Sequence, residues 1–261
     1  MMLRWMILAA ALISTTGCAT MINTLEPAAP ERVEINNSEF SSLPPPAGGP
    51  IVAAVYGFAD RTGQRKASDR VAHISTAVTQ GADVWVIKAL QEVGQGRWFR
   101  VVERGGLEHL ARERQIIRQT RESVNDPTPL APLMFAGVLI EGGIIGYDSN
   151  TLTGGAGARY LGIGATTEYR EDVVTVSMRV TSVQTGEILM SVATTKTVVS
   201  VSNRAGVLRF VEAGTRAVEA EIGYSQNEPI NHAIRLSIEQ AVVEMIRQGV
   251  KRGYWDFEKQ Q

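Results

Sequence analysis

The sequence feature that most constrains the fold is a two-residue alternation of apolar and polar side chains that recurs between residues 146 and 226. In the clearest run, Val174, Val176 and Met178 alternate with polar residues. Successive side chains of a β-strand point to opposite faces, so this alternation predicts strands with one apolar and one polar face. Both a soluble antiparallel sheet with one wet face and a transmembrane barrel show the pattern. The alternation alone favours the soluble sheet, because the barrel signal is weak in each segment.

Two of these runs supply the candidates for membrane strands. Their apolar face is made of Leu161, Ile163, Ala165, Tyr169, Val218, Ala220 and Ile222. Their polar face carries the lumen-facing candidates Glu168, Arg170, Glu219 and Glu221. The alternating runs of one chain supply about four strands, which cannot close a barrel, because an open sheet edge in lipid leaves backbone groups without hydrogen bonds. A pore built from these strands therefore requires several copies of the chain.

Residues 1–17 are typical of an export signal peptide. A positive charge at Arg4 precedes an apolar run over residues 5–13, which is too short to cross a bilayer as a helix. Small residues then lead to Cys18, the single cysteine of the chain, so we expect cleavage before Cys18 and attachment of lipid to its sulfur. An ordinary cleaved signal followed by a cysteine is the alternative. Ala19, in place of an aspartate, favours transfer to the outer membrane of a Gram-negative bacterium.

The rest of the chain predicts a mixed α/β domain behind an arm. Residues 18–50 are rich in proline, alanine and serine and predict an extended lipidated arm. Short β-branched or apolar runs predict strands at 51–56, 98–102 and 133–147. Apolar residues at helical spacing predict a helix from Ser75 or Thr76 to about Glu92, with Val78, Ala82, Trp85 and Ala89 on one face. The same spacing predicts an amphipathic helix over 105–122 and a helix around Ile234, Ile238, Ala241 and Met245 in the segment 227–261.

Composition argues against several classes of function. Lys and Arg number 26 and Asp and Glu 27, which gives no basic stripe for nucleic acid. One cysteine and three histidines without metal-ligand spacing predict no metal site and no cofactor. The sequence contains no phosphate-binding loop, and nothing near Glu219 and Glu221 marks them as an acid/base pair. We therefore expect no catalytic residues and no enzyme activity.

Residues 141–150 (EGGIIGYDSN), followed by residues 157–165 (GARYLGIGA), resemble the CsgG-type curli secretion channel lipoprotein family. Shorter matches include residues 60–64 (DRTGQ), 185–189 (TGEIL) and 252–256 (RGYWD). The matches follow one another in order between about residues 51 and 257.

The resemblance implies an α+β periplasmic domain, with a mixed sheet flanked by helices, and two transmembrane β-hairpins per protomer. The first hairpin with its flanking strand would span 146–180, a periplasmic return 181–200, and the second hairpin 201–226. The first part of the periplasmic domain, 51–145, would carry the constriction loop. Nine protomers would share one barrel of 36 strands, the number in the largest known barrel. The outer-membrane pore would pass unfolded curli-type amyloid subunits by diffusion, without nucleotide hydrolysis, and bind periplasmic and extracellular accessory factors.

The resemblance also places the constriction loop just before residues 75–78. The family's Tyr, Asn and Phe positions fall on Ser68 or Asp69, His73 and Ile74, so this chain departs from the family at each of them. A ring of His73 imidazoles would gain positive charge in mildly acidic solution and shift ion preference toward anions. The alternative is that His73 packs at the base of the loop. For the whole chain, the alternative function is a structural or partner-binding periplasmic lipoprotein without a pore.

Overall fold

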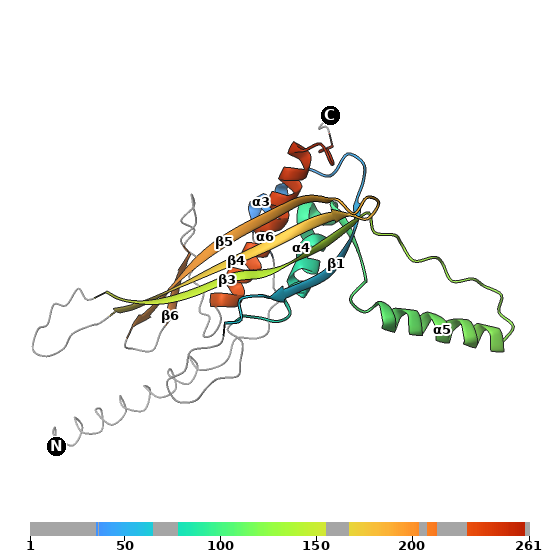
Figure 1. Ribbon diagram of the computed structural model, residues 1–261, viewed down its shortest axis with the longest axis horizontal. Helices are drawn as coiled ribbons and strands as arrows, with labels where there is room; N and C mark the ends of the chain where they lie inside the picture. The colour runs from blue at the N-terminus through green and yellow to red at the C-terminus, as the bar shows by residue number, and fades with distance from the viewer. Residues whose placement is uncertain are drawn as a thin grey trace, which may run out of the picture. The chain divides into compact units, whose positions relative to one another are not determined.

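The computed structural model describes residues 35, 37–64, 78–154, 167–203, 208–212 and 229–258. Within them lies a six-stranded sheet in the order β2-β1-β3-β4-β5-β6 (Figure 1). The strands are β1 (Ile51–Asp60), β2 (Phe99–Val102), β3 (Val138–Gly154), β4 (Thr167–Ser182), β5 (Ile188–Asn203) and β6 (Leu208–Glu212). β1 pairs in parallel with β2 and β3, and the other pairs are antiparallel. The expected mixed sheet is confirmed.

The described helices are α3 (Ser38–Ser42), α4 (Ala82–Gly96), α5 (Leu107–Ser123) and α6 (Pro229–Lys251). α4 and α6 cover one face of the sheet, and α5 lies apart from it (Figure 1). α6 packs on β4 and β5, α4 packs on β1 and β2, and α3 contacts both α4 and α6. The face predicted for the last helix is confirmed, because Ile234, Ile238, Ala241 and Met245 are all fully buried. No helix in the described ranges combines the length and apolar character needed to cross a membrane.

The N-terminal border of two elements differs from the prediction. α4 begins at Ala82, after Gly81, and Val78 is buried outside the helix. The expected helix start at Ser75 or Thr76 is therefore wrong for residues 78–81, where the backbone is not helical. β3 begins at Val138 rather than near residue 133, and it continues without interruption to Gly154.

The apolar face of α4 also differs in part from the expected one. The expected face contained Val78, Ala82, Trp85 and Ala89. The helix instead buries Ala82, Val86, Ala89, Leu90 and Val93, and Trp85 is only half-buried. The predicted end near Glu92 is confirmed, because the backbone leaves helical geometry at Val93.

The end of the expected arm packs on the domain. Phe40 in α3 and Leu43 are buried, so residues 38–50 are not the free extended arm that their composition predicts. The indole Nε1 of Trp98 donates a hydrogen bond to the carbonyl of Pro44 at 2.8 Å. The C-terminal segment closes over the same region, where the amide of Ala47 donates to the carbonyl of Asp256 at 2.9 Å. The segment around Ala47 and the C-terminal segment around Asp256 therefore hold each other in place, although they lie far apart in the sequence.

Candidate functional site: the strand base and the loop stem

Burial is described only part of the way along the three long strands. Within that part, the buried side chains nearest to the far ends of the strands are Tyr147 on β3, Asp172 on β4 and Val198 on β5; we call these three residues the strand base. Beyond it the strands continue through residues 148–154, 167–171 and 199–203, still in antiparallel register with one another. The described side chains of β3 just beyond the strand base, Asp148, Ser149 and Asn150, are exposed, while the strand stays paired with β4.

Polar side chains fix the strand base inside the core. The hydroxyl of Tyr147 donates to Oδ1 of Asp172 at 3.0 Å, and both side chains are buried. A buried carboxylate is costly unless it is hydrogen-bonded, so this contact supports both strands where the core ends. The hydroxyl of Thr194 on β5 donates to the carbonyl of Ser237 at 2.7 Å, which joins the sheet to α6.

Glycines let β1 and β4 approach β3 closely just before the strand base. A Cβ on Gly142 would lie 2.1 Å from the carbonyl oxygen of Ser177 and 2.7 Å from Cε2 of Phe58. A Cβ on Gly143 would lie 2.4 Å from the carbonyl oxygen of Ala59. Neither position has room for a side chain, which gives a physical reason for the paired glycines in the EGGIIGYDSN segment.

The end of β1 carries a second polar arrangement, made of residues 60–64 and 78–80, which we call the loop stem. Oδ1 of Asp60 accepts hydrogen bonds from the amide and the hydroxyl of Thr62, at 2.8 and 2.7 Å. Oδ2 of Asp60 accepts from Nε2 of Gln80 at 3.2 Å. One carboxylate thus contacts both ends of the segment that lies between residues 64 and 78.

The uncovered face of the sheet is polar near its centre. Arg179 on β4 donates from Nε and Nη2 to one oxygen of Glu141 on β3, at 3.0 and 2.7 Å. The hydroxyls of Thr175 and Thr195 lie 3.0 Å apart across β4 and β5. These contacts are exposed, so they add little to the free energy of unfolding. Their main effect is to favour the observed pairing register of β3 with β4 and of β4 with β5.

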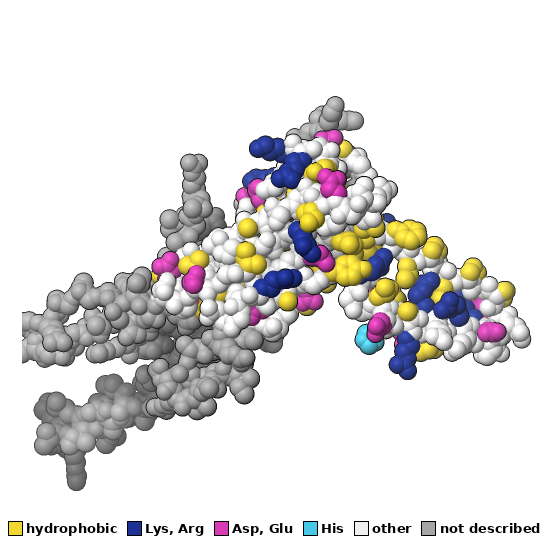
Figure 2. Space-filling model, in the orientation of Figure 1, with side chains coloured by type: hydrophobic (Ala, Val, Ile, Leu, Met, Phe, Trp, Pro, Cys, Tyr) yellow, Lys and Arg dark blue, Asp and Glu magenta, His cyan; other side chains and the backbone are white. Residues whose placement is uncertain are grey.

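α5 differs from the other long helices because none of its residues is buried. Arginine and apolar side chains share the surface around it (Figure 2). The segment that follows the helix exposes Val124, Leu133, Met134 and Phe135, and Phe135 is 88% exposed. We call the consecutive residues Leu133, Met134 and Phe135 the apolar strip. A surface of this kind is typical of a contact site for another chain.

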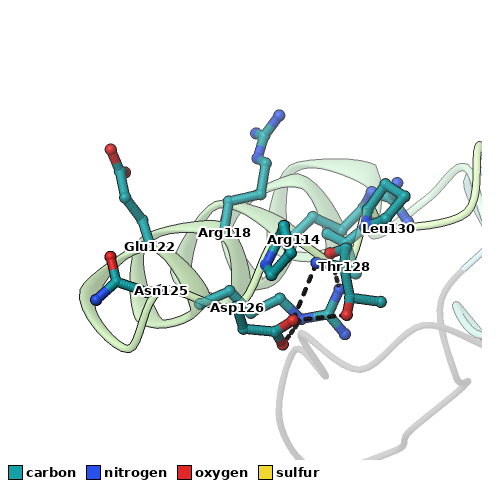
Figure 3. A pocket seen from close by; sticks show the side chains of 10 residues that line it. Arg114, Arg118, Glu122, Asn125, Asp126, Thr128 and Leu130 are labelled. Carbon is teal, nitrogen blue, oxygen red and sulfur yellow. Dashed lines mark hydrogen bonds and ion pairs between the residues drawn. The ribbon is translucent and has the colours of Figure 1, made fainter.

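An open pocket of about 660 Å³ lies between α5 and the segment that returns from it (Figure 3). Arg114 donates to the carbonyl of Ala131 at 2.7 Å, and Arg121 donates to the carbonyl of Thr128 at 2.6 Å. The hydroxyl and amide of Thr128 donate to Asp126 and, with the charge of Arg121, hold the pKa of that carboxyl below its usual value. The pocket residues hold the returning segment in place.

Most of the residues that the sequence proposes for the site lie outside the described residues. These are Cys18, Ser68, Asp69, His73, Ile74, Leu161, Ile163, Ala165, Val218, Glu219, Ala220, Glu221 and Ile222. Glu168, Tyr169 and Arg170 lie on β4, where their backbones pair with Ser202, Val201 and Ser200 of β5. The assigned lipid-facing, lumen-facing and constriction roles all stay predictions.

Sequence reasoning missed the strand base and the loop stem. The Asp-x-Thr spacing at residues 60–62 is a local signal for a side-chain turn and could have indicated part of the stem. The contacts of Asp60 with Gln80, and of Tyr147 with Asp172, join residues 20 and 25 positions apart. No local pattern identifies such partners. Among the residues that the structure describes, no group of three His, Cys, Asp or Glu could hold a metal ion.

Comparison with known proteins places this fold and these motifs in a class of secretion components. The family model "Curli production assembly/transport component CsgG" matches residues 36–261. The curli production assembly/transport components of Citrobacter koseri and Escherichia coli K12 are 44% and 43% identical over 224 residues, which cover 84% of this chain and 79% of each relative. The chain therefore belongs to the CsgG family of curli assembly and transport components. The resemblance inferred from the motifs is confirmed.

One solved structure with a related fold is much more distant in sequence. The PelC dodecamer from Paraburkholderia phytofirmans is 14% identical, with a TM-score of 0.30, over 77% of this chain and 92% of that chain. A similarity this weak says nothing about the assembly or function of this chain. The family supports a transport role rather than an enzymatic one.

Proposed function

We propose that the chain is one protomer of an oligomeric outer-membrane channel that exports unfolded curli-type amyloid subunits by nucleotide-independent diffusion. The observation that carries this proposal is the continuation of β3, β4 and β5 beyond the strand base, in register, with Asp148, Ser149 and Asn150 of β3 exposed. Strands of this kind can enter lipid only when their edges are closed by further strands. The family membership supports the transport role.

Closure requires more than one chain. β2 and β6 are the two ends of the described sheet, and each has one neighbour in it. Copies of the chain could close the barrel by pairing hairpin to hairpin, and the resemblance to the family favours a ring of nine. The exposed apolar strip after α5 supports contact between neighbouring protomers, because a lone protomer leaves Phe135 almost wholly in water.

The anchor and the constriction complete the proposal. Lipid on Cys18 would tether the protomer to the outer membrane, with the α/β domain in the periplasm. The first hairpin and its flanking strand would lie in 146–180 and the second in 201–226. The constriction would lie on Ser68, Asp69, His73 and Ile74, with periplasmic and extracellular accessory factors acting at the two mouths of the ring. The loop stem supports this placement, because the hydrogen bond from Gln80 to Asp60 joins described residues that precede and follow this segment in the sequence.

Two neighbouring substitutions test the membrane assignment. Ala165→Arg places a charge on the predicted lipid face, which costs about 2–4 kcal/mol per strand at the bilayer midplane. Thr166→Arg places the same charge on the predicted lumen face of the same strand. We expect Ala165→Arg to abolish uniform current steps in a planar bilayer, while Thr166→Arg conducts and shifts ion preference toward anions.

The wild-type protein is the reference for both variants, and vesicle flotation reports membrane insertion independently of current. If the two variants insert and conduct equally well, residues 161–171 do not cross lipid. If the wild-type protein is released from membranes as a non-conducting monomer, the chain is a structural or partner-binding lipoprotein without a pore.

A further inference from the structure

Residues 43–46 (LPPP), which we call the proline segment, have the geometry of polyproline II between α3 and β1. Leu43 has a φ of −57° and a ψ of 127°, close to the polyproline II values, and the three prolines after it hold φ in the same region. Polyproline II has three residues per turn, so positions three apart face the same side. Leu43 and Pro46 are buried, while the two prolines between them are half-buried. The proline segment therefore presents one side to the domain with the period of this conformation.

The proline segment contacts an aromatic cluster. The indole Nε1 of Trp98 donates a hydrogen bond to the carbonyl of Pro44 at 2.8 Å. Phe257 forms a backbone bridge with Pro46, and its ring lies edge to face with that of Trp98, with 5.7 Å between the ring centroids. A polyproline II segment makes no hydrogen bonds of its own, so its carbonyls depend on donors from outside. Grooves lined by aromatic side chains are a recurrent binding site for such segments.

The two indoles of this cluster have supports other than the proline segment. The ring centroids of Trp98 and Trp255 lie 6.4 Å apart. A Cβ on Gly94 would lie 2.6 Å from Cδ1 of Trp98, and a Cβ on Gly249 of α6 would overlap the ring of Trp255. Each indole thus lies directly against a glycine. Nε1 of Trp255 also donates to the carbonyl of Ile246 at 2.9 Å. The aromatic surface is therefore built on α4 and α6.

We propose that Trp98, Trp255 and Phe257 form a binding site for proline-rich segments in the polyproline II conformation, and that such a segment of a partner protein displaces the proline segment from it. The inference does not depend on the channel. An open pocket of about 310 Å³ beside Pro44 and Pro45 gives an incoming segment room to approach. As part of the same chain, the proline segment acts at about millimolar effective concentration, so the partner competes against an internal ligand.

Opening the site in the full-length protein tests the proposal. The double variant Leu43→Asp/Pro46→Asp puts charges at the two buried positions of the proline segment, which disfavours its docking. Fluorescence anisotropy then follows a labelled peptide with the sequence of residues 42–48 (SLPPPAG). We expect saturable binding to the double variant and at least about tenfold weaker binding to the wild-type protein, whose own segment competes. Ala47→Asp is the matched control, because Ala47 is exposed, and it should bind as weakly as the wild type.

Two comparisons separate recognition of polyproline II from nonspecific adsorption. A peptide with alanine at the three proline positions is less preorganised and should bind the double variant about tenfold more weakly. Adding Trp98→Phe to the double variant removes the indole donor and should weaken binding of SLPPPAG about tenfold. Equal binding of the two peptides, an affinity that Trp98→Phe does not change, or no saturable binding to a folded double variant overturns the proposal.

Amide hydrogen exchange of the wild-type protein keeps the proposal testable if the double variant does not fold. The amide of Ala47 donates to the carbonyl of Asp256 at 2.9 Å next to the docked proline segment. Millimolar SLPPPAG should speed exchange at Ala47 severalfold and leave amides in the centre of β3 unchanged, whereas the alanine peptide should have no effect. Exchange at Ala47 that SLPPPAG does not change, or that both peptides change equally, overturns the proposal.

Discussion

Gly142, on β3 before the strand base, is the position where one added methyl group should lower the stability of the sheet most. In Gly142→Ala, the new Cβ would lie 2.1 Å from the carbonyl oxygen of Ser177, so β4 must move by about 0.9 Å to reach the 3.0 Å that real Cβ contacts keep. The same Cβ would lie 2.7 Å from Cε2 of Phe58 on β1, so a shift of β4 alone does not relieve both contacts. Overpacking costs about 1–3 kcal/mol, and backbone against backbone belongs at the upper end, at about 3 kcal/mol.

Gly146→Ala is the matched control on the same strand. Its Cβ would meet only the side chain of Thr175, at 3.3 and 3.4 Å, which can adjust. We therefore expect a cost below about 1 kcal/mol. For a domain of this size, about 3 kcal/mol corresponds to a fall of about 6–12 °C in melting temperature, and the control to less than about 4 °C.

Circular dichroism of the full-length protein in detergent, at matched concentration, gives both melting temperatures. Gly142→Ala melting within about 2 °C of wild type would refute the close-approach argument. So would a larger fall in Gly146→Ala than in Gly142→Ala.

Three further predictions address other parts of the molecule. Phe135→Ser should leave the melting temperature of the protomer unchanged, since the Phe135 side chain is 88% exposed. It should lower severalfold the fraction of assembled oligomers in native mass spectrometry, and an oligomer fraction equal to that of the wild type would contradict a contact there. Trp98→Phe should cost about 1–3 kcal/mol in urea denaturation because the carbonyl of Pro44 loses its donor, and an unchanged midpoint would count against that hydrogen bond. The pKa of Asp126 is lowered by the hydrogen bonds from Thr128, so its stabilising effect is complete above the usual value of 3.8 and is lost as the pH falls through the lower folded pKa. Amide exchange at Thr128, corrected for its intrinsic pH dependence, should accelerate in that range, and Asp126→Asn should show no such step.

Hydrophobic patterning predicted the elements that form the core. The short apolar runs gave β1 and β2, and the helical spacing of Ile234, Ile238 and Met245 gave the buried face of α6, because burial itself produces those patterns. The end of α4 near Glu92 was also predicted. A kink follows there, at Gly94, where a Cβ would lie 2.6 Å from Cδ1 of Trp98.

Local signals failed where a distant partner decides the structure. Ser75 and Thr76 are typical helix N-caps, yet α4 starts after Gly81 without a side-chain cap, and Gln80 just before it binds Asp60 instead. The exposed apolar residues of α5 also fit the expected amphipathic pattern, but no part of the chain that the structure describes buries them. A pattern of this kind reports that a face is apolar and does not identify what covers it.

Export of an unfolded chain through the wild-type channel tests the central claim most directly. Lipidated full-length protein would be reconstituted in a planar bilayer, and an unfolded, curli-type amyloid polypeptide would be added to one side without nucleotide. The account predicts transient current blockades whose frequency rises in proportion to polypeptide concentration, with the polypeptide recovered on the opposite side. A stable bilayer with inserted protein, no blockades and no polypeptide on the opposite side would contradict it.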